Sequence, residues 1–393
     1  MLSNGRPYLA IPGPSVMPDA VLRAMHRAAP NIYTGELHEV TRSLVPDLAR
    51  VAGTAHHTAI YIGNGHAAWE AALANVVAPG ETVLVLATGH FGHAWGGVAD
   101  GLGIALQVED FGQRSPVDPD RVTEILRGDT DGRIKAILAV HVDTATGVKS
   151  DIAAIRAGID RAGHAGLLMV DCIASLGCDR YEMDAWGANV TVAACQKGLM
   201  TPPGLGFVWF DDRAAAVRDA MPRVSRYWDW RPRANPTEYW MYWAGTAPTH
   251  HVYGLRAALD IIADEGLEAI WQRHEILAHA IWAAVDAWGA DGPMTLNIPD
   301  AAARSHAVTS VEIGGADGDR LRAWCEGTAG LTLGIGLGRT PASAFFRIGH
   351  MGHVNAQMVL GTLATMEAGL CACDIAHGKG AVEAAARVIA QAG

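Results

Sequence analysis

Lys197 stands in a setting that suits chemistry rather than solvation. It is one of only four lysines in the chain, and it lies between an apolar run and a loop rich in glycine and proline (192–206). A lysine in apolar surroundings loses solvation, which lowers its pKa and leaves a neutral amine that can attack an aldehyde. The alternative is an ordinary lysine with a buried stem and an exposed ammonium group.

A second candidate site is the string GNGHAA (63–68), which leads into the helix-forming run WEAALANVV. Glycines before a helix allow backbone N–H groups to face an anion, and the helix dipole adds to the attraction. The string also fits the dinucleotide pattern GxGxxA, but that pattern needs an acidic residue about 20 positions further on, after the next strand. The next strand is followed by Thr88, Gly89 and His90, so a single phosphate fits better. A tight turn with a helix cap is the alternative without a ligand.

Two charged residues complete the candidate set. Asp171 closes the apolar run LLMVD (167–171), at the sheet edge where open α/β proteins bind ligands, although it could simply cap the following helix. Arg347 lies beside aromatic residues in the run FFRIGHM (345–351), and its planar guanidinium can hold a carboxylate through two parallel hydrogen bonds. An internal structural ion pair is the alternative for Arg347.

Together these features supply what pyridoxal 5'-phosphate requires of a protein. They are an anion site, a carboxylate for the pyridine nitrogen, an amine for a Schiff base and a clamp for the substrate carboxylate. An NAD-dependent oxidoreductase would use GNGHAA as its fingerprint but would not need such a lysine. It is the alternative from another class of enzyme.

The residues around these sites alternate between short apolar runs and amphipathic stretches, the pattern of parallel strands joined by helices. The predicted fold class is therefore α/β, doubly wound. The expected strands cover residues 83–87, 134–142, 167–171, 189–195 and 205–210. The expected helices cover about 66–78, 117–127, 151–162 and 213–220.

A long helical pattern over 252–289, interrupted near Glu265 and Gly266, leads out of this region. Beyond Pro293 the order changes to strand, helix, strand, strand and helix, which is typical of a smaller α+β unit. We expect an N-terminal arm, a large domain that binds the cofactor and a small C-terminal domain, over residues 1–20, 21–265 and 266–393.

Composition narrows the classes of function. Of the 393 residues 41 are acidic and 30 basic, and the formal net charge of -11 repels nucleic acids and anionic membranes. No apolar stretch approaches the roughly 18 residues of a membrane span, and no signal peptide is evident, so we expect a soluble cytoplasmic protein. The six cysteines form no CxxC pair, so we expect free thiols and no metal site.

The motifs of this chain resemble those of the class V pyridoxal-phosphate aminotransferases, most closely the serine-glyoxylate and alanine-glyoxylate group. The resemblance runs from about residue 8 to the end of the sequence. It rests on PGPS (12–15), GNGHAAWEAAL (63–73), TGHF (88–91), HVDTATGVKSDI (141–152), CQKGLMTPPGLGF (195–207), RYWDWR (226–231) and FRIGHMG (346–352). It implies PLP fold type I, as in aspartate aminotransferase, with a large, mostly parallel-sheet domain and a smaller C-terminal α+β domain.

The resemblance also implies roles for residues at matching positions. Lys197 corresponds to the lysine that forms the Schiff base with the cofactor, and Asp171 to the carboxylate that keeps the ring nitrogen protonated. Arg347 corresponds to the residue that binds the substrate α-carboxylate. The other cofactor contacts implied are Asn64, Gly65, His66 and Gln196 near the phosphate, Phe91 stacked on the ring, and Thr144 near the phenolic oxygen.

In such relatives a tyrosine and a threonine from the other subunit also reach the phosphate. Thr246 matches the threonine, whereas the string WAGTAP (243–248) offers Trp243 and leaves the tyrosine unassigned. Seven aromatic residues between 227 and 243 suggest an interface wall beside the active site, unless that loop folds on its own subunit. We therefore expect a homodimer, or a dimer of dimers, with active sites at the interface.

The activity implied is a ping-pong transfer of an amino group from a small amino acid, serine first, to a 2-oxo acid, glyoxylate first. Alanine, aspartate and ureidoglycine are alternative donors. A pyridoxamine-pyruvate branch is a further alternative, since it shares RIGHMG and the tail GKGxxEAA with this chain, although it lacks the GxGH and TGHF strings. A cysteine desulfurase would need a reactive thiol on a mobile loop, for which Cys325 is a poor candidate.

Overall fold

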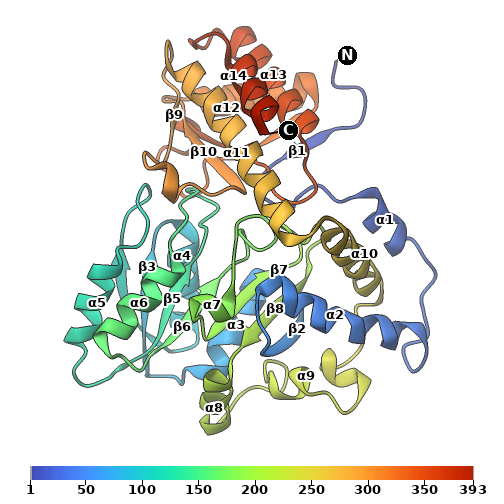
Figure 1. Cartoon of the computed structure of the whole chain (residues 1–393), viewed down its shortest axis with the longest axis vertical. Coiled ribbons are helices and arrows are strands. Elements are labelled where there is room, and N and C mark those ends of the chain that lie inside the picture. Colours follow the sequence, from blue (N-terminus) through green and yellow to red (C-terminus); the bar gives the residue numbers. More distant parts are fainter. Residues whose placement is uncertain (1, 393) are drawn as a thin grey trace.

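The computed structural model describes residues 2–392 and contains two β-sheets, each covered by helices (Figure 1). The first sheet has seven strands in the order β2-β8-β7-β6-β5-β3-β4. Neighbouring strands are parallel from β4 through β3, β5 and β6 to β7, whereas β8 runs antiparallel to both β7 and β2. The sheet is therefore mostly parallel, and the expected α/β class is confirmed.

All five strands expected from the sequence are present, each within two residues of its expected bounds, and the pattern missed two more strands of this sheet. The seven strands are β2 (His57–Gly63), β3 (Thr82–Ala87), β4 (Ala105–Asp110), β5 (Ile134–Val140), β6 (Leu167–Asp171), β7 (Val190–Ala194) and β8 (Gly204–Phe210). The strand β4 escaped prediction because it lies at the sheet edge and most of its residues are exposed, so it carries no continuous apolar run.

The helices of this part of the chain include the four that were expected. They are α1 (Asp19–Met25), α2 (Glu36–Ala52), α3 (Gly65–Val76), α4 (His90–Gly101), α5 (Pro119–Gly128), α6 (Ile152–Ala162), α7 (Met183–Trp186), α8 (Asp212–Ala220), α9 (Arg231–Ala234) and α10 (Thr249–Glu265). The helix α4 was missed because its glycines lower helix propensity. One of them, Gly92, packs so closely that a Cβ there would lie 2.9 Å from the Cα of Ala87.

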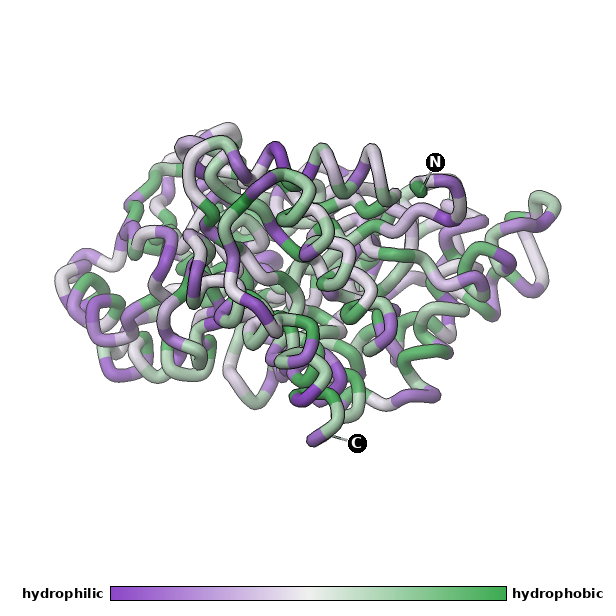
Figure 2. The backbone as a smooth tube through the Cα atoms, turned by 90° about the horizontal axis from the view of Figure 1, so that it is seen from above, coloured by the Kyte–Doolittle hydropathy of each residue, from purple (hydrophilic) through white to green (hydrophobic). Residues whose placement is uncertain are grey.

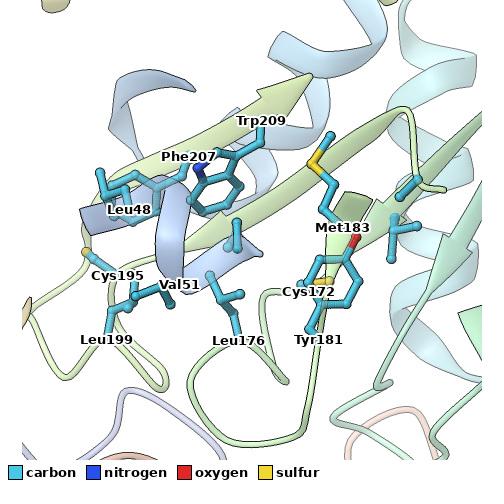
Figure 3. Packing of buried hydrophobic residues seen from close by; sticks show 14 of the residues in the cluster. Leu48, Val51, Cys172, Leu176, Tyr181, Met183, Cys195, Leu199, Phe207 and Trp209 are labelled. Atoms are coloured by element: carbon cyan, nitrogen blue, oxygen red, sulfur yellow. The ribbon is translucent and has the colours of Figure 1, made fainter. Parts of the chain in front are cut away.

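Both faces of the first sheet are buried, which explains why its central strands are continuously apolar. Successive residues of β3 belong to different cores: Leu84 and Leu86 pack on one face, and Val83 and Val85 on the other. Figure 3 shows the first of these cores near the ends of the strands, with Cys172 and Cys195 among its buried side chains. Since these cysteines adjoin Asp171 and Gln196 in the chain, packing holds the backbone beside both residues.

The second sheet has five strands in the order β1-β11-β12-β10-β9. Its strands are β1 (Tyr8–Ala10), β9 (Thr295–Leu296), β10 (Val308–Glu312), β11 (Leu331–Ile335) and β12 (Phe345–Gly349). The helices around it are α11 (Leu267–Gly289), α12 (Asp317–Ala329), α13 (Ala356–Ala372) and α14 (Ala381–Ala392), in orange and red at the top of Figure 1. The first strand of the chain, β1, pairs in parallel with β11, so part of the expected N-terminal arm belongs to this sheet.

The long helical pattern is two helices, α10 and α11, separated by Gly266 at φ +84. Ile262 and Ile270 still pack in the core of the first sheet, whereas Leu277 and Ile281 pack with the second. We propose that the boundary between the large and small domains lies close to this break.

Figure 2 shows hydrophobic and hydrophilic residues alternating along helices at the outside of the molecule, as expected for helices with one apolar face. Among the described residues, no helix combines the length and the apolar character that a bilayer crossing requires. All six cysteines are free thiols, as predicted, and Cys325 is buried.

Candidate active site

The expected site residues gather at the carboxyl ends of neighbouring strands. Asn64 follows β2, Phe91 follows β3, Thr144 follows β5, Asp171 ends β6 and Lys197 follows β7. A cavity of about 250 Å³ opens at this edge of the sheet. Its lining residues are Gly13, Pro14, Asn64, Gly65, His66, Trp69, Phe91, Val142, Thr144, Asp171, Ile173, Ala174, Gln196, Lys197 and Pro203.

The side chain of Lys197 is buried, with 9% of its residue surface exposed. Burial, together with the nearby positive charge of Arg347, lowers the pKa of Lys197 to about 8. The Nζ atom donates a hydrogen bond to the carbonyl oxygen of Pro12. The exposed-head alternative is therefore wrong, and the amine is neutral in a larger fraction of molecules than an ordinary lysine at the same pH.

The N-terminal segment 12–15 forms one wall of the site above this lysine. The hydroxyl of Ser15 donates to the carbonyl oxygen of Lys197 at 2.6 Å, and its backbone N–H donates to the carbonyl oxygen of Gln196 at 2.9 Å. Gly13 has φ +93, and a Cβ at this position would lie 2.5 Å from Cε of Lys197. Glycine is required here both by its backbone conformation and by the space that the lysine occupies.

Asp171 is held by two donors at the end of β6. Its Oδ1 accepts the backbone N–H of Ile173 at 2.7 Å, and its Oδ2 accepts the indole N–H of Trp69 at 3.0 Å. Burial nevertheless raises the pKa of Asp171 to about 7, because desolvation outweighs these two bonds. The hydrogen bond from Ile173 resembles a cap, which was the alternative role for Asp171. A buried carboxylate that lines a cavity also suits a cationic ring nitrogen.

Trp69 was missed by the sequence analysis, although it lies on α3 within the motif that marks the anion site. Its indole N–H is the only donor from another element that reaches the carboxylate of Asp171 in the described residues. The hydrogen bond favours the ionised carboxylate, so it lowers the pKa of Asp171 against the effect of burial.

We expect Trp69→Phe to lower kcat by about 10-fold, the effect of losing one hydrogen bond to a charged group. Since the lost donor had lowered the pKa of Asp171, the acidic limb of the pH profile of kcat/KM should move to higher pH. Trp95→Phe is a matched control, because Trp95 stacks on Trp69 at 6.0 Å but its indole N–H has no hydrogen-bond partner. If both variants shift the profile equally, the bond to Asp171 has no special role.

The N-terminus of α3 provides the anion side of the cavity. The side-chain oxygen of Asn64 caps the helix, accepting the backbone N–H groups of His66 at 3.1 Å and Ala67 at 3.4 Å. The helix cap that was the alternative without a ligand is therefore present. The same helix N-terminus, with the positive end of its dipole, also lines the cavity. Across the cavity, the buried Oε1 of Gln196 has no hydrogen-bond partner. An unpartnered carbonyl oxygen and a helix N-terminus in one cavity fit a polar ligand with donor and acceptor groups.

A buried carboxylate, Asp143, organises the far wall. Its Oδ2 accepts the backbone N–H groups of Phe91 at 2.7 Å and Gly92 at 3.3 Å, and its Oδ1 accepts that of Ala145 at 2.9 Å. Burial raises the pKa of Asp143, opposed by these bonds. It positions the ring of Phe91 over the cavity. The sequence could have indicated Asp143, because it lies just beyond β5, as Asp171 lies at the end of β6.

Arg347 lies beside the cavity rather than in its wall. From the middle strand β12, its Nη1 donates to the carbonyl oxygen of Thr144 and its Nε to that of Ile335, both at 2.7 Å. No carboxylate pairs with it within the described part of the chain, so the structural ion pair is wrong. Burial lowers the pKa of Arg347 to about 10. A buried guanidinium without an acidic partner is suited to a carboxylate that arrives with a ligand.

The structure places Thr246, an expected site residue, away from the cavity of Lys197. It is exposed and lines a different cavity of about 640 Å³ together with Tyr33, His38 and Trp240. The aromatic loop around it folds largely on its own chain: Trp230 and Trp243 are buried, whereas Trp240 is 43% exposed. Thr246 therefore does not reach the cavity of Lys197 in its own chain.

Comparison with known proteins agrees with this geometry. The model of the family "Aminotransferase class-V" matches residues 8–351. The chain belongs to the class V aminotransferases. This membership rejects the NAD-dependent oxidoreductase and identifies an enzyme that depends on pyridoxal 5'-phosphate.

Three relatives illustrate the range of this family. A serine--glyoxylate aminotransferase of Methylorubrum extorquens is 35% identical over 93% of this chain and 91% of the relative. An L-aspartate--glyoxylate aminotransferase of Paracoccus denitrificans is 33% identical over 91% of this chain and 89% of the relative. The crystal structure of a pyridoxamine-pyruvate aminotransferase from Mesorhizobium loti superposes with a TM-score of 0.89 at 26% identity, covering 99% of this chain and 98% of that one.

The residues of this class V aminotransferase fit the cofactor. The cavity offers a buried amine of lowered pKa, a buried carboxylate of raised pKa and the N-terminus of α3. These groups match the aldehyde, the pyridine nitrogen and the phosphate. When bound, pyridoxal 5'-phosphate supplies an aldehyde carbon and an electron-withdrawing ring.

Proposed function

We propose that this class V aminotransferase moves the amino group of a small neutral amino acid, serine first, to glyoxylate in a ping-pong cycle. Similarity to a serine--glyoxylate aminotransferase over most of both chains supports this choice. The observation that carries it is the lining of the cavity, where Lys197 is the only lysine or arginine among the described residues. Arg347, beside the cavity, is assigned to the α-carboxylate, so a donor with a second carboxylate, such as aspartate, would find no further lysine or arginine in this lining.

The roles of the residues follow from their positions. Lys197 Nζ takes up the proton from the α-carbon of the bound amino acid and later returns it, since its lowered pKa allows both steps near neutral pH. The carboxylate of Asp171 keeps the ring nitrogen protonated, and Phe91 stacks on the ring. Asn64, Gly65, His66 and Gln196 hold the phosphate end, and Thr144 lies near the phenolic oxygen.

Arg347 binds the α-carboxylate of both substrates in this proposal. We expect Arg347→Ala to raise KM for the amino acid by about 100-fold, the loss of one or two charge-assisted hydrogen bonds, with cofactor binding retained. Loss of the nearby positive charge should also raise the pKa of Lys197. Steady-state kinetics and a pH titration measure both effects. Arg320→Ala, on the exposed side of α12, is the control, and an unchanged KM in Arg347→Ala would remove the arginine from substrate binding.

We propose that the active enzyme is a homodimer in which Thr246 of one chain reaches the phosphate site of the other. Exposure of Thr246 and of Ile62, Tyr227 and Trp240 supports an interface on this face. We expect light scattering to give the mass of at least two chains, and Thr246→Ala to weaken cofactor binding by about 10-fold. A monomer with full activity would contradict the proposal.

A donor and acceptor panel tests the proposed substrates. Serine, alanine, aspartate, ureidoglycine and pyridoxamine are each assayed with glyoxylate and with pyruvate, and kcat/KM is compared. Serine with glyoxylate should give the highest value. A preference for aspartate, or for pyridoxamine with pyruvate, would replace the proposed substrates while leaving the transaminase assignment in place.

A further inference from the structure

A group of metal-ligating side chains lies on the small-domain side of the molecule, away from the cavity of Lys197. Glu275 and His279 are one helical turn apart on α11, so they share one face of that helix. His306 lies just before β10. One ligand atom from each of the three residues lies within 4.8 Å of the other two.

We propose that Glu275, His279 and His306 bind one divalent transition-metal ion, for which Zn²⁺ is the probe. Two imidazoles and a carboxylate are a donor set that zinc accepts, and water completes a tetrahedral shell. Zinc lies about 2.0–2.2 Å from nitrogen and oxygen ligands, so the three donors must approach one another slightly. Glu275 and His279 are exposed, so surrounding groups leave room for this adjustment.

The third ligand is already oriented. The carboxylate of Asp179, with 1% of its side chain exposed, lies 3.5 Å from Nδ1 of His306. It also accepts the backbone N–H of His306 at 3.0 Å and the hydroxyl of Ser305 at 2.8 Å. A carboxylate on one imidazole nitrogen leaves the other nitrogen as the lone-pair donor, the arrangement that supports histidine ligands in metal sites. Asp179 is not one of the three ligands, and its contacts with Ser305 and His306 hold the segment that carries the third ligand.

The surroundings also favour an ion. The ring of Trp282 lies 4.9 Å from that of His279 and 5.9 Å from that of His306, so one flank of the cluster is shielded from water. Asp179 has a single lysine partner, Lys149, at 3.4 Å. A bound ion would join α11 to the segment before β10 and add positive charge near that buried carboxylate. Cysteine spacing could not indicate this site, because none of its three ligands is a cysteine and His306 is distant in the chain from the other two.

The test is a calorimetric titration of the metal-free holoenzyme with Zn²⁺. We expect one ion per chain, and at least about a 100-fold loss of affinity in both His279→Ala and His306→Ala, since removing a ligand should exceed the 10–100-fold effect of outer partners. His279 is exposed, so its variant should fold as the wild type does, which circular dichroism in metal-free buffer verifies.

Two variants control for other zinc-binding groups. His57→Ala removes a surface histidine whose ring lies 3.0 Å from Asp212, and Cys371→Ser removes an exposed thiol 3.7 Å from His377. Both should bind zinc as the wild type does. The proposal is overturned if micromolar Zn²⁺ does not bind, or if the affinity is unchanged in His279→Ala and falls in either control. None of these readouts depends on transaminase activity.

Discussion

Lys197→Ala should lower kcat by about 10⁴-fold or more, because one substitution removes both the amine that joins the cofactor and the base that moves the α-proton. The visible absorbance of the cofactor joined to the protein should disappear with it. The expected loss is large because this amine lines the cavity and its burial lowers its pKa to about 8. Stopped-flow and steady-state assays of serine with glyoxylate measure the loss.

Lys197→Arg provides a second variant, because it keeps a positive charge but no nucleophilic amine, and it should be as inactive as the alanine variant. Lys135→Ala is the matched control, since Lys135 is exposed and bonds only to the carbonyl oxygen of Gly132. Appreciable turnover in Lys197→Ala, with cofactor still joined to the protein, would disprove the assignment of the active site.

Asp171→Asn should lower kcat by roughly 10²–10⁴-fold, the range of a positioned acid–base group, because a neutral amide cannot keep the ring nitrogen protonated. The two hydrogen-bond donors around Asp171 add to the expected loss of activity. Both oxygens of Asp171 accept an N–H group, from Ile173 and Trp69, and asparagine must turn its NH₂ group toward one of them. Asp264→Asn, at an exposed position of α10, is the control.

The same variant should change the pH dependence of apoprotein stability. Burial raises the pKa of Asp171 from 3.8 to about 7, so between these pH values the folded state holds a proton that the unfolded state releases. Its contribution to stability is therefore greatest below pH 3.8 and falls as pH rises through 7. Relative to wild type, Asp171→Asn should gain stability over this range in thermal unfolding. A constant difference would mean that Asp171 is ionised throughout.

Much of the site could be predicted because its residues depend on local context. Asp171 and Lys197 each follow an apolar strand, and parallel strands place their carboxyl ends at one edge. Trp69 and Asp143 were missed for a different reason. A tryptophan in an apolar helix and an aspartate in a loop have many possible partners. Only the packing of α3 against the sheet brings Trp69 to Asp171, and only the fold brings Asp143 to the backbone of Phe91.

The sequence by itself determined the α/β class, the central strands, the family and the candidate residues for chemistry, because periodicity and short motifs are local properties of the chain. The tertiary structure alone decided which groups meet. It placed β1 in the second sheet, segment 12–15 over Lys197 and His306 beside α11, and it kept Thr246 away from the cavity of Lys197 in the same chain. These contacts join residues far apart in the chain, and the free energy of burying them together leaves no periodic pattern in the sequence.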